Sequence, residues 1–532
     1  MKASNLLTAL LALIFLLTAC NTKPIEKTPT MPVVQAPAAP TYDDAIQIIL
    51  GDDSITVDGA AVGADATAAV YIANDIVYYE SGKDFTYGEG SEKDAHSPDE
   101  AAAHTVLHIT KPGTYRLSGK LPLGQIAVDL GDDAKNDPNA VVTLVLNGVD
   151  ITCEVAPAVI FYNVYECGND DAEKATKDVD TAAAGANVII ADGTINTVNG
   201  SYVERIYQPE SVVLSDDKTE VEDADKLHKY DGAFYSKRSM NIFGGEENTG
   251  VLNIKAENEG LDSEMHLTIN GGDIRIESGN DGINTNEDGV SVTTVNGGKL
   301  TIKVTGETGE GDGIDSNGWL VINGGTVVAE ACSNSADAGI DSDMGIHING
   351  GTVIATGHML DRIEDGGQNY AVFNFAQKQA GNENLSMKDQ NGNAIFETKA
   401  ENAYSILIFS SPDLKAGTYT LWSNEKQLAG SSGGMIGGPG MESGGMGRPE
   451  RPDNMQPPAD GGQVPEGFAP PEGGNLPEGF NPPEEDNRPE MPEGNRPGNP
   501  GGNNMGLQEM TTDFVIRDGG NMFSIILQKG EQ

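Results

Sequence analysis

Four acidic or amide residues occupy one position of a repeated phrase, and their chemistry is that of ligands for a hard cation. The phrase is Gly-(Leu/Ile)-(Asp/Asn)-(Ser/Thr), and its third position holds Asp262, Asn284, Asp315 and Asp341. Further carboxylates flank it: Asp281, Asp312 and Asp337 come shortly before the phrase, and Glu264, Asp288 and Asp343 come shortly after it. Calcium accepts six to eight such oxygens at about 2.3–2.6 Å. We therefore predict that these residues supply calcium ligands.

Repulsion among the carboxylates is the physical reason for expecting a bound ion. Two carboxylates one strand spacing apart repel by about 3.5 kcal/mol at an effective dielectric constant near 20. Several such contacts would consume much of a domain's net stability, which is roughly 5–15 kcal/mol. A divalent cation between the carboxylates removes this cost, and so does protonation. The alternative interpretation is a solvated acidic edge that only keeps the protein soluble.

A second phrase, Asn-Gly-Gly, predicts the elements that position these side chains. It begins at Asn270, Asn296, Asn323 and Asn349, and this period of about 26 residues marks a repeat architecture. Apolar residues occupy alternate positions after each phrase, which is the period of a β-strand. Short strands joined by Gly and Asn corners describe a parallel β-helix. Each coil of such a helix, which we call a lap, stacks on the next at roughly 4.8 Å. Stacking brings the acidic positions of successive laps into register.

Outward-facing positions of the same strands carry opposite charges on neighbouring laps. Asp273 faces Lys299, and Glu277 faces Lys303, if the repeats are in register. We expect these residues to form ordinary cross-strand ion pairs, each worth well under about 1 kcal/mol.

The net charge and the absence of several sequence motifs exclude some classes of function, and the cysteines leave a disulfide open. The 532-residue chain has a formal net charge of −48, which argues against nucleic acid as a partner because phosphates would be repelled. The histidines show no zinc spacing, and the chain has no nucleophile elbow or phosphate loop. Cys153 and Cys167 either close a disulfide loop or remain free thiols, and Cys332 has no evident partner.

The amino-terminal segments predict export and membrane anchoring. Leu6 to Leu17 is an apolar run too short to span a membrane, and Leu17 to Cys20 resembles a bacterial lipobox. We predict a lipoprotein signal peptide at 1–20, with diacylglycerol on the Cys20 thiol; the alternative is an ordinary signal peptide with a chance cysteine. Residues 21–41 are rich in Pro, Thr and Ala and predict a disordered tether. The protein would then be lipid-anchored at the cell membrane, facing the extracellular side.

The remaining segments complete an all-β chain. We predict an N-terminal β region at 42–112, a parallel β-helix at 113–357 and a C-terminal β cap at 358–429, with 167–184 and 207–230 looped out. Residues 430–507 are rich in Gly, Pro and Met and cannot bury enough apolar surface to order themselves, which predicts a disordered insertion. The final strands, within 508–532, are expected to return to the cap beside Leu421.

Several motifs follow one another in a characteristic order. They are Gly113 to Gly119 (GTYRLSG), Leu146 to Thr152 with Ala156 to Val159 after it, the Gly-Ile-Asp-Ser and Asn-Gly-Gly-Thr repeats, and Ser410 to Lys415. Together they make the chain resemble the carbohydrate-binding-domain lipoproteins of bacteria. The resemblance implies a right-handed parallel β-helix with bound calcium that binds polysaccharide, including cellulose-like glucans and polygalacturonate, and that is distantly similar to calcium-dependent pectate lyases. The chain departs from the family pattern at Asn284, where Asp is typical, and in the long 207–230 excursion.

Non-catalytic binding of polysaccharide by a monomer is the function we predict. Trp319 faces outward if its neighbours Leu320 and Ile322 point inward, so that its indole is either a platform for a sugar ring or a surface covered by the cap or a loop. The rival function is a calcium-dependent polysaccharide lyase, which needs a basic side chain beside the metal. Lys237 and Arg238 are the candidates for that role or for carbohydrate contact; otherwise they are solvated or pair with acidic loops. A third possibility is a structural surface adhesin without glycan specificity.

Overall fold

The computed structural model describes residues 36–51, 54–432 and 510–526. These residues form β-strands in sheets, with one short α-helix, α2 (Pro98–Ala102), and one 3-10 helix, η1 (Asp132–Asn136). The predicted all-β class is therefore confirmed for this part of the chain. The predicted signal peptide with Cys20, most of the predicted tether and residues 433–507 of the predicted insertion lie outside the described residues.

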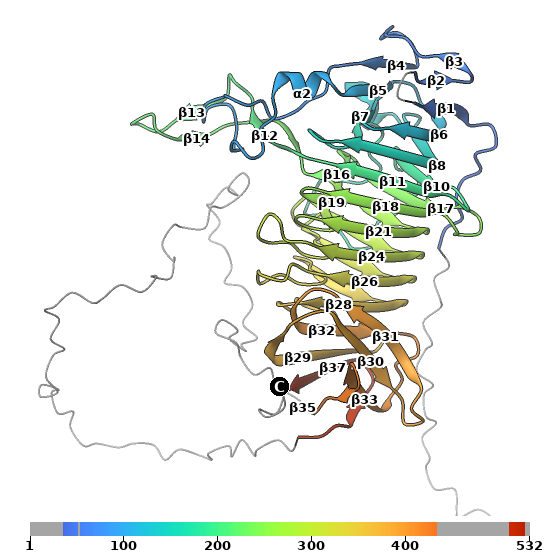
Figure 1. Cartoon of the computed structure of the whole chain (residues 1–532), viewed down its shortest axis with the longest axis vertical. Coiled ribbons are helices and arrows are strands. Elements are labelled where there is room, and N and C mark those ends of the chain that lie inside the picture. Colours follow the sequence, from blue (N-terminus) through green and yellow to red (C-terminus); the bar gives the residue numbers. More distant parts are fainter. Residues whose placement is uncertain (1–35, 52–53, 433–509, 527–532) are drawn as a thin grey trace, which may run out of the picture. The chain divides into compact units, whose positions relative to one another are not determined.

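Parallel strands stack in three ladders over the described residues. The first ladder consists of β1 (Ile46–Leu50), β6 (Gly113–Leu121), β8 (Val142–Cys153), β10 (Ala186–Ile190), β17 (Met240–Gly244), β20 (Leu267–Ile269), β23 (Val292–Val295), β25 (Trp319–Ile322) and β27 (Gly345–Ile348). The second consists of the end of β8, β11 (Ile195–Gly200), β18 (Val251–Ala256), β21 (Asp273–Ser278), β24 (Lys299–Val304), β26 (Thr326–Glu330) and β28 (Thr352–Gly357). Each strand pairs in parallel with the equivalent strand of the next lap (Figure 1).

The third ladder carries the predicted acidic positions. It consists of β4 (Val70–Ala73), β5 (Thr105–Ile109), β7 (Gly124–Asp129), β9 (Val159–Asn163), β16 (Gly232–Ser236), β19 (Glu259–Ser263) and β22 (Ile283–Thr285), all parallel except the edge pair β4–β5. A parallel bridge between Ile283 and Ile314 extends it by one lap. Strand β1 from the N-terminal region pairs in parallel with β6, so the first ladder begins upstream of Gly113, with β2 (Thr56–Val57) and β3 (Ala60–Ala61) beside it.

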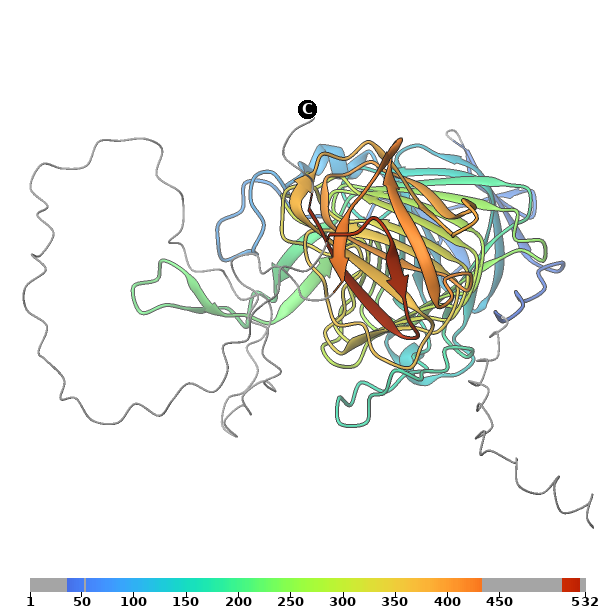
Figure 2. The ribbon, with the colours of Figure 1, turned by 90° about the horizontal axis from the view of Figure 1, so that it is seen from below.

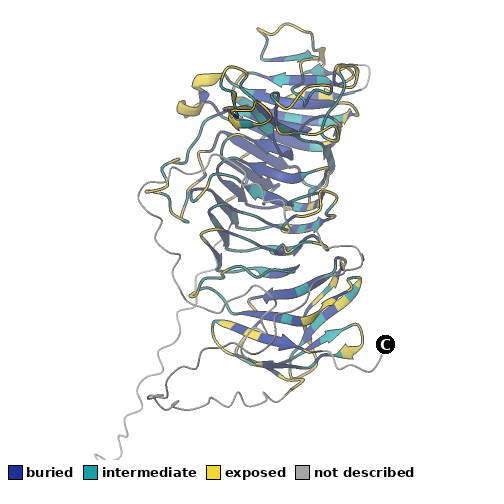
Figure 3. Ribbon diagram, turned by 90° about the vertical axis from the view of Figure 1, so that its left-hand side faces the viewer, coloured by how far each residue is buried: buried dark blue, intermediate teal, exposed yellow. Residues whose placement is uncertain are grey.

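The ladders enclose one continuous apolar core. Inward positions of the third ladder, such as Leu261, Ile283 and Ile314, have no exposed surface. Figure 3 shows the same distribution, with buried residues along the ladder strands and exposed residues mainly in the connecting loops and at the edges of the cap. Alternation of inward apolar and outward polar side chains thus positions the acidic residues on the outer surface of the third ladder.

The Asn-Gly-Gly phrases form the corners between the first and second ladders. The second glycine of each phrase has a positive φ, between 78° and 93°, at Gly272, Gly298, Gly325 and Gly351. A Cβ on Gly298 would lie 2.5 Å from the carbonyl oxygen of Gly272 in the preceding lap. Both the left-handed backbone and the close approach of stacked corners therefore require glycine.

A β cap covers the last lap. Strand β32 (Tyr404–Ser410) pairs antiparallel with β28, and β29 (Tyr370–Gln379) pairs with β32 and with β37 (Gly520–Ile525). The remaining cap strands are β30 (Glu383–Lys388), β31 (Ala394–Ala400), β33 (Gly417–Ser423), β34 (Lys426–Gln427), β35 (Gly430–Ser432) and β36 (Phe514–Ile516). Figure 2, seen from below, places these strands in front of the ladder strands.

The returning strands lie where the sequence predicts them. Strand β36 pairs with β33 through Tyr419 and Phe514, close to Leu421. One boundary is wrong, because residues 430–432 form β35 and pair with β37. They belong to the cap and not to the insertion.

Two segments that were predicted to loop out are held by specific contacts. Residues 203–230 form an antiparallel excursion of β12 (Val203–Tyr207), β13 (Val213–Leu214), β14 (Val221–Asp223) and β15 (Lys226–Tyr230). Within the other segment, Thr181 hydrogen-bonds Asn241 and Thr268 on the first ladder. The three described cysteines, Cys153, Cys167 and Cys332, are free thiols, so no disulfide joins Cys153 to Cys167.

Candidate functional site

Successive laps place the third positions of the repeated phrase directly above one another. Asp262 is the register partner of Asn284 in the β19–β22 pair. One lap further, the Asp315 N–H donates to the Ile283 carbonyl at 2.8 Å, and the Asp341 N–H donates to the Ile314 carbonyl at 2.7 Å. The fixed repeat length thus produces a column of oxygen-bearing side chains on the outer surface of the third ladder. We call this surface the acidic face.

Three of the predicted residues converge at the lower end of the acidic face, which is the end formed by the last laps before the cap. Asp312, Asp315 and Asp341 each offer a carboxylate oxygen, and these atoms all lie within 4.8 Å of one another. We call these three residues the Asp312 cluster. Their side chains are half-buried. Oxygens at this spacing, from two successive laps, are suited to contact one divalent ion.

Burial and mutual repulsion raise the proton affinity of this cluster. The pKa of Asp312 rises to about 9, chiefly because of burial and then because of the neighbouring Asp281 carboxylate. Burial with the Asp361 carboxylate raises the pKa of Asp341 to about 7, and burial with Asp343 raises that of Asp315 to about 6. Their ordinary value is 3.8. Without a cation, part of the repulsion is relieved by bound protons.

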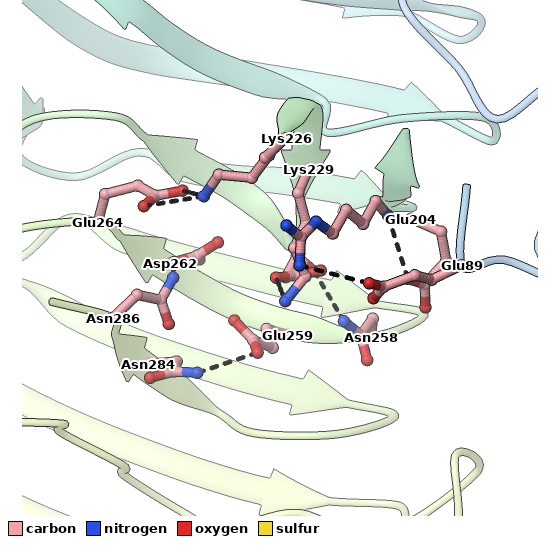
Figure 4. A network of polar contacts seen from close by, with 12 residues as sticks. Glu89, Glu204, Lys226, Lys229, Asn258, Glu259, Asp262, Glu264, Asn284 and Asn286 are labelled. Carbon is pink, nitrogen blue, oxygen red and sulfur yellow. Dashed lines mark hydrogen bonds and ion pairs between the residues drawn. The ribbon is translucent and has the colours of Figure 1, made fainter. Parts of the chain in front are cut away.

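A second group of oxygens lies at the upper end of the acidic face, on the earlier strands β19 and β22. Asp262 is 0% exposed and Glu259 is 5% exposed. The Asn284 amide donates to Glu259 Oε1 at 3.1 Å, and the Asn286 amide donates to Asp262 Oδ1 at 2.8 Å (Figure 4). We call Glu259, Asp262 and Asn284 the Glu259 cluster.

Each member of the Glu259 cluster also has an unsatisfied oxygen. Glu259 Oε2, Asp262 Oδ2 and Asn284 Oδ1 are buried and have no hydrogen-bond partner among the described residues. Leaving a buried charged acceptor unpaired costs more than about 1–3 kcal/mol. Burial raises the pKa of Glu259 and of Asp262 well above the ordinary values, followed by repulsion from Asp262 and from Asp231 respectively. A bound proton or a bound cation would satisfy these oxygens.

Lysines from the excursion partly neutralise this end. Lys229 Nζ lies 3.0 Å from Asp231, and the pKa of Lys229 is raised by Asp231 and, more weakly, by Glu259 and Asp262. Lys226 Nζ lies 3.3 Å from Glu264 (Figure 4). Glu264 also accepts a hydrogen bond from the Tyr235 hydroxyl at 2.7 Å. One ammonium beside Asp231, Glu259 and Asp262 leaves negative charge uncompensated when all three carboxylates are ionised.

The other predicted carboxylates have different positions. Asp281 accepts from the Asp312 N–H at 2.6 Å, and Asp337 accepts from the Gly311 N–H at 2.6 Å, so one oxygen of each binds backbone. Asp288 is exposed and accepts from the Asn317 amide at 2.9 Å. Asp343 is exposed on the rim, close enough to raise the pKa of Asp315. These residues surround the two clusters and do not converge with them.

Sequence reasoning missed several residues of the acidic face. Glu259 had a signal, because it directly precedes Gly260 as Asp281 and Asp312 precede their glycines. Lys229 belongs to the excursion, Asp231 directly follows it, and Asp361 lies after the last repeat. Their positions had no periodic signal.

The predicted carbohydrate contacts do not form one site. Trp319 is half-buried on β25, between Val292 and Gly345 of the neighbouring strands, and so belongs to the first ladder. Lys237 is exposed just after β16. Arg238 is half-buried, its Nε has no hydrogen-bond partner among the described residues, and its carbonyl accepts from the Ser236 hydroxyl at 2.6 Å.

The chain matches one family model and superposes loosely on one solved structure. No helix in the described residues is long and apolar enough to cross a membrane. One solved structure, described as the polysaccharide lyase-like protein from C. thermocellum in a gadolinium derivative, is 19% identical, covers 58% of this chain and 90% of its own, and superposes with a TM-score of 0.32. Curated proteins give no match. A family model described as "Carbohydrate-binding domain-containing protein" matches residues 103–171 and 178–389, more than half of the chain, so the chain belongs to the carbohydrate-binding domain-containing family.

Proposed function

We propose that this protein binds polysaccharide without catalysis, through calcium ions held on the acidic face. The stacked laps would form a right-handed parallel β-helix, and the chain would be a monomer attached to the cell membrane by lipid on Cys20, facing outward. Family membership supports the polysaccharide partner. The parallel pairing of equivalent strands supports the helix, since each lap repeats the one before it.

The observation that carries the calcium proposal is the set of unsatisfied oxygens in the Glu259 cluster. Glu259 Oε2, Asp262 Oδ2 and Asn284 Oδ1 are all buried acceptors without donors in the described residues. Oxygen donors of this kind suit a hard divalent cation better than a transition metal, which prefers nitrogen or sulfur ligands. The residues present therefore fit calcium.

The Asp312 cluster offers a second position for an ion. Asp312, Asp315 and Asp341 would hold it, with Asp281 and Asp337 binding the backbone around them. Bound calcium would offset the carboxylate charge and accept uronate oxygens of a polysaccharide in its open coordination positions. Binding of an acidic glycan would then depend on calcium, because the glycan and the protein otherwise repel each other.

Binding without proton abstraction is supported by the basic residues near the acidic face. A lyase needs an amine that loses its proton easily. The Asp231 carboxylate instead raises the pKa of Lys229, and Lys226 is paired with Glu264. Lys237 remains an exposed candidate for the rival lyase function. Ultraviolet-absorbing unsaturated products from polygalacturonate and calcium would establish that function.

Calorimetry and affinity electrophoresis test the proposal together. Calcium titrated into metal-free protein at neutral pH should release heat with saturable stoichiometry. Native gels containing polygalacturonate should retard the protein in calcium and not in chelator. Full thermal stability in chelator, together with no heat of calcium binding, would refute the metal sites. An absence of retardation by any polysaccharide would favour a structural adhesin.

A further inference from the structure

A groove on the first ladder is separate from the acidic face and differs from it in chemistry. Its volume is about 560 Å³, within the usual range of ligand sites. Its floor is formed by outward side chains of β17, β20, β23 and β25 and by the Asn-Gly-Gly corners. The lining residues of the floor are Asn241, Phe243, Thr268, Asn270, Thr294, Asn296, Val321, Asn323 and Asn349. None of them is charged, in a chain whose net charge is −48.

The corner asparagines form a directional chain of amides along the floor. The Asn296 amide donates to Asn270, Asn323 donates to Asn296, and Asn349 donates to Asn323, each at 2.9 Å. Each Asn side chain has two N–H donors and a carbonyl with two lone pairs. These ladder bonds use one donor on each of Asn296, Asn323 and Asn349 and leave further capacity, and these three side chains are half-buried rather than covered.

A second outward column runs beside the asparagines. Thr268 pairs with Thr294, and Thr294 pairs with Val321, on successive strands. Because Thr294 and Asn296 are two residues apart on the same strand and corner, both point outward. The floor thus offers a hydroxyl, an apolar surface and amides, repeated at the lap spacing of roughly 4.8 Å.

The walls give the groove its direction and close one end. Residues 177–182 form one wall, which Thr181 attaches to the floor by hydrogen bonds of 2.7 Å to Asn241 and 2.8 Å to Thr268. Residues 37–40 contribute the other wall. Among the described lining residues, Lys177 is the one cation and is paired with Asp178, and Asp180 adds a second carboxylate. From Thr294 onward the floor runs across successive strands.

We propose that this groove binds an uncharged, extended polysaccharide chain, such as a β-linked glucan, laid across successive laps. Sugar hydroxyls are both donors and acceptors and match the spare amide groups, while their ring faces suit the Val321 surface. The lap spacing is close to the length of one sugar residue in an extended chain, so successive sugars lie over successive amides, with every second sugar presenting the same edge. The described lining residues offer an acidic glycan no cation besides Lys177, which is already paired with Asp178. The proposal rests on polysaccharide being the partner, but it requires no calcium.

Two arginine substitutions on the same lap test the assignment. Thr294→Arg places a long side chain on the floor, whereas Thr301→Arg makes the same change on an outward position of β24 in the second ladder. The probes are cellohexaose in calorimetry and hydroxyethylcellulose in native gels, both in chelator. We expect the unmodified protein and Thr301→Arg to bind equally and Thr294→Arg to bind at least tenfold more weakly. Val179→Arg, on the wall, should weaken binding in the same direction and covers the case in which Thr294→Arg does not fold.

The outcomes separate this groove from the acidic face. Retention by neutral glucan that persists in chelator and is lost in Thr294→Arg supports the groove, whatever happens to calcium. Neutral-glucan binding that chelator abolishes, that Thr294→Arg and Val179→Arg leave unchanged, or that the unmodified protein lacks would overturn it. Failure of calcium binding or of polygalacturonate retention, with neutral-glucan binding intact, would instead refute the calcium-dependent function alone.

Discussion

The Asp281 carboxylate accepts a hydrogen bond from the backbone N–H of Asp312 at 2.6 Å, and each of these residues belongs to a different lap. Asp312 repeats the contact by accepting from the Ala338 N–H at 2.5 Å. The series ends at Ala338, which has no side-chain acceptor. Each of these acidic side chains thus joins two laps through one carboxylate oxygen and leaves its other oxygen for a proton or an ion. The expected dependence of stability on pH and on calcium follows from this second oxygen.

The metal-free protein should lose stability as the pH rises from 5 to 8. The pKa values of Asp315, Asp341 and Asp312 in the folded protein are about 6, 7 and 9, against an ordinary 3.8. The folded state therefore binds more protons than the unfolded state between these values. The stabilisation is fully present below pH about 4 and is lost as the pH passes through the folded values. Thermal unfolding in chelator at several pH values measures it.

Calcium should reverse this trend, because the ion replaces the protons. We expect calcium to raise the melting temperature more at pH 8 than at pH 5. A melting temperature in chelator that increases steadily from pH 5 to 8 would contradict the raised pKa values.

Removal of two carboxylate charges from the Asp312 cluster should weaken calcium binding. Asp315→Asn with Asp341→Asn keeps the side-chain shape but lowers the attraction for a divalent ion, so the affinity should fall at least tenfold at this position. The melting temperature in chelator should rise, since the repulsion is also removed. Calorimetry and thermal unfolding report the two effects. Asp288→Asn, on the exposed rim, is the matched control and should change neither quantity appreciably.

Replacement of Lys229 should make the upper end of the acidic face dependent on a cation. Lys229→Met removes the ammonium beside Asp231, Glu259 and Asp262, so the metal-free protein should lose on the order of 2 kcal/mol. Calcium should restore most of this loss. Lys226→Met, which removes an exposed partner of Glu264, should cost less than about 1 kcal/mol. Equal effects of the two substitutions in chelator unfolding would show that Lys229 has no special role.

A glycine pair tests the stacking of the corners. Gly298→Ala meets both a φ of 79° and the Gly272 carbonyl oxygen at 2.5 Å, whereas Gly289→Ala meets a φ of 65° with no atom within 4 Å. We expect about 1 kcal/mol of destabilisation at Gly289 and at least twice that at Gly298. Thermal or denaturant unfolding measures the difference. Similar costs at both positions would mean that the laps do not approach each other so closely.

The lipid anchor has a direct cellular test. Cys20→Ser removes the thiol that would carry diacylglycerol, so the protein should move from the membrane fraction to the soluble fraction. Metabolic labelling with a fatty acid should mark the unmodified protein and not the variant. Retention of the variant in membranes without label would mean that another segment holds the protein there.

The sequence could predict backbone register but not the partner of every charge. Asp273 lies opposite Lys299 and Glu277 opposite Lys303, as the repeat implies. The ion pairs differ, however: Asp273 binds Arg275 at 2.6 Å, and Lys303 binds Glu401 of the cap at 2.8 Å. Long exposed side chains choose among several nearby partners, and a cap residue distant in the chain has no periodic signal.

The sequence by itself determined the all-β class, the corners at the Asn-Gly-Gly phrases and the alignment of Asp262, Asn284, Asp315 and Asp341 on successive laps. A fixed repeat length is sufficient for these features, because it makes each residue the neighbour of its equivalent one lap away. Only the tertiary structure decided which side-chain oxygens remain without a hydrogen-bond or charge partner. Lys229 and Asp361 reach the acidic face from segments outside the repeat, and backbone N–H groups occupy one oxygen each of Asp281, Asp312 and Asp337. Such contacts depend on how non-repeating segments fold back over the laps, which periodicity does not encode.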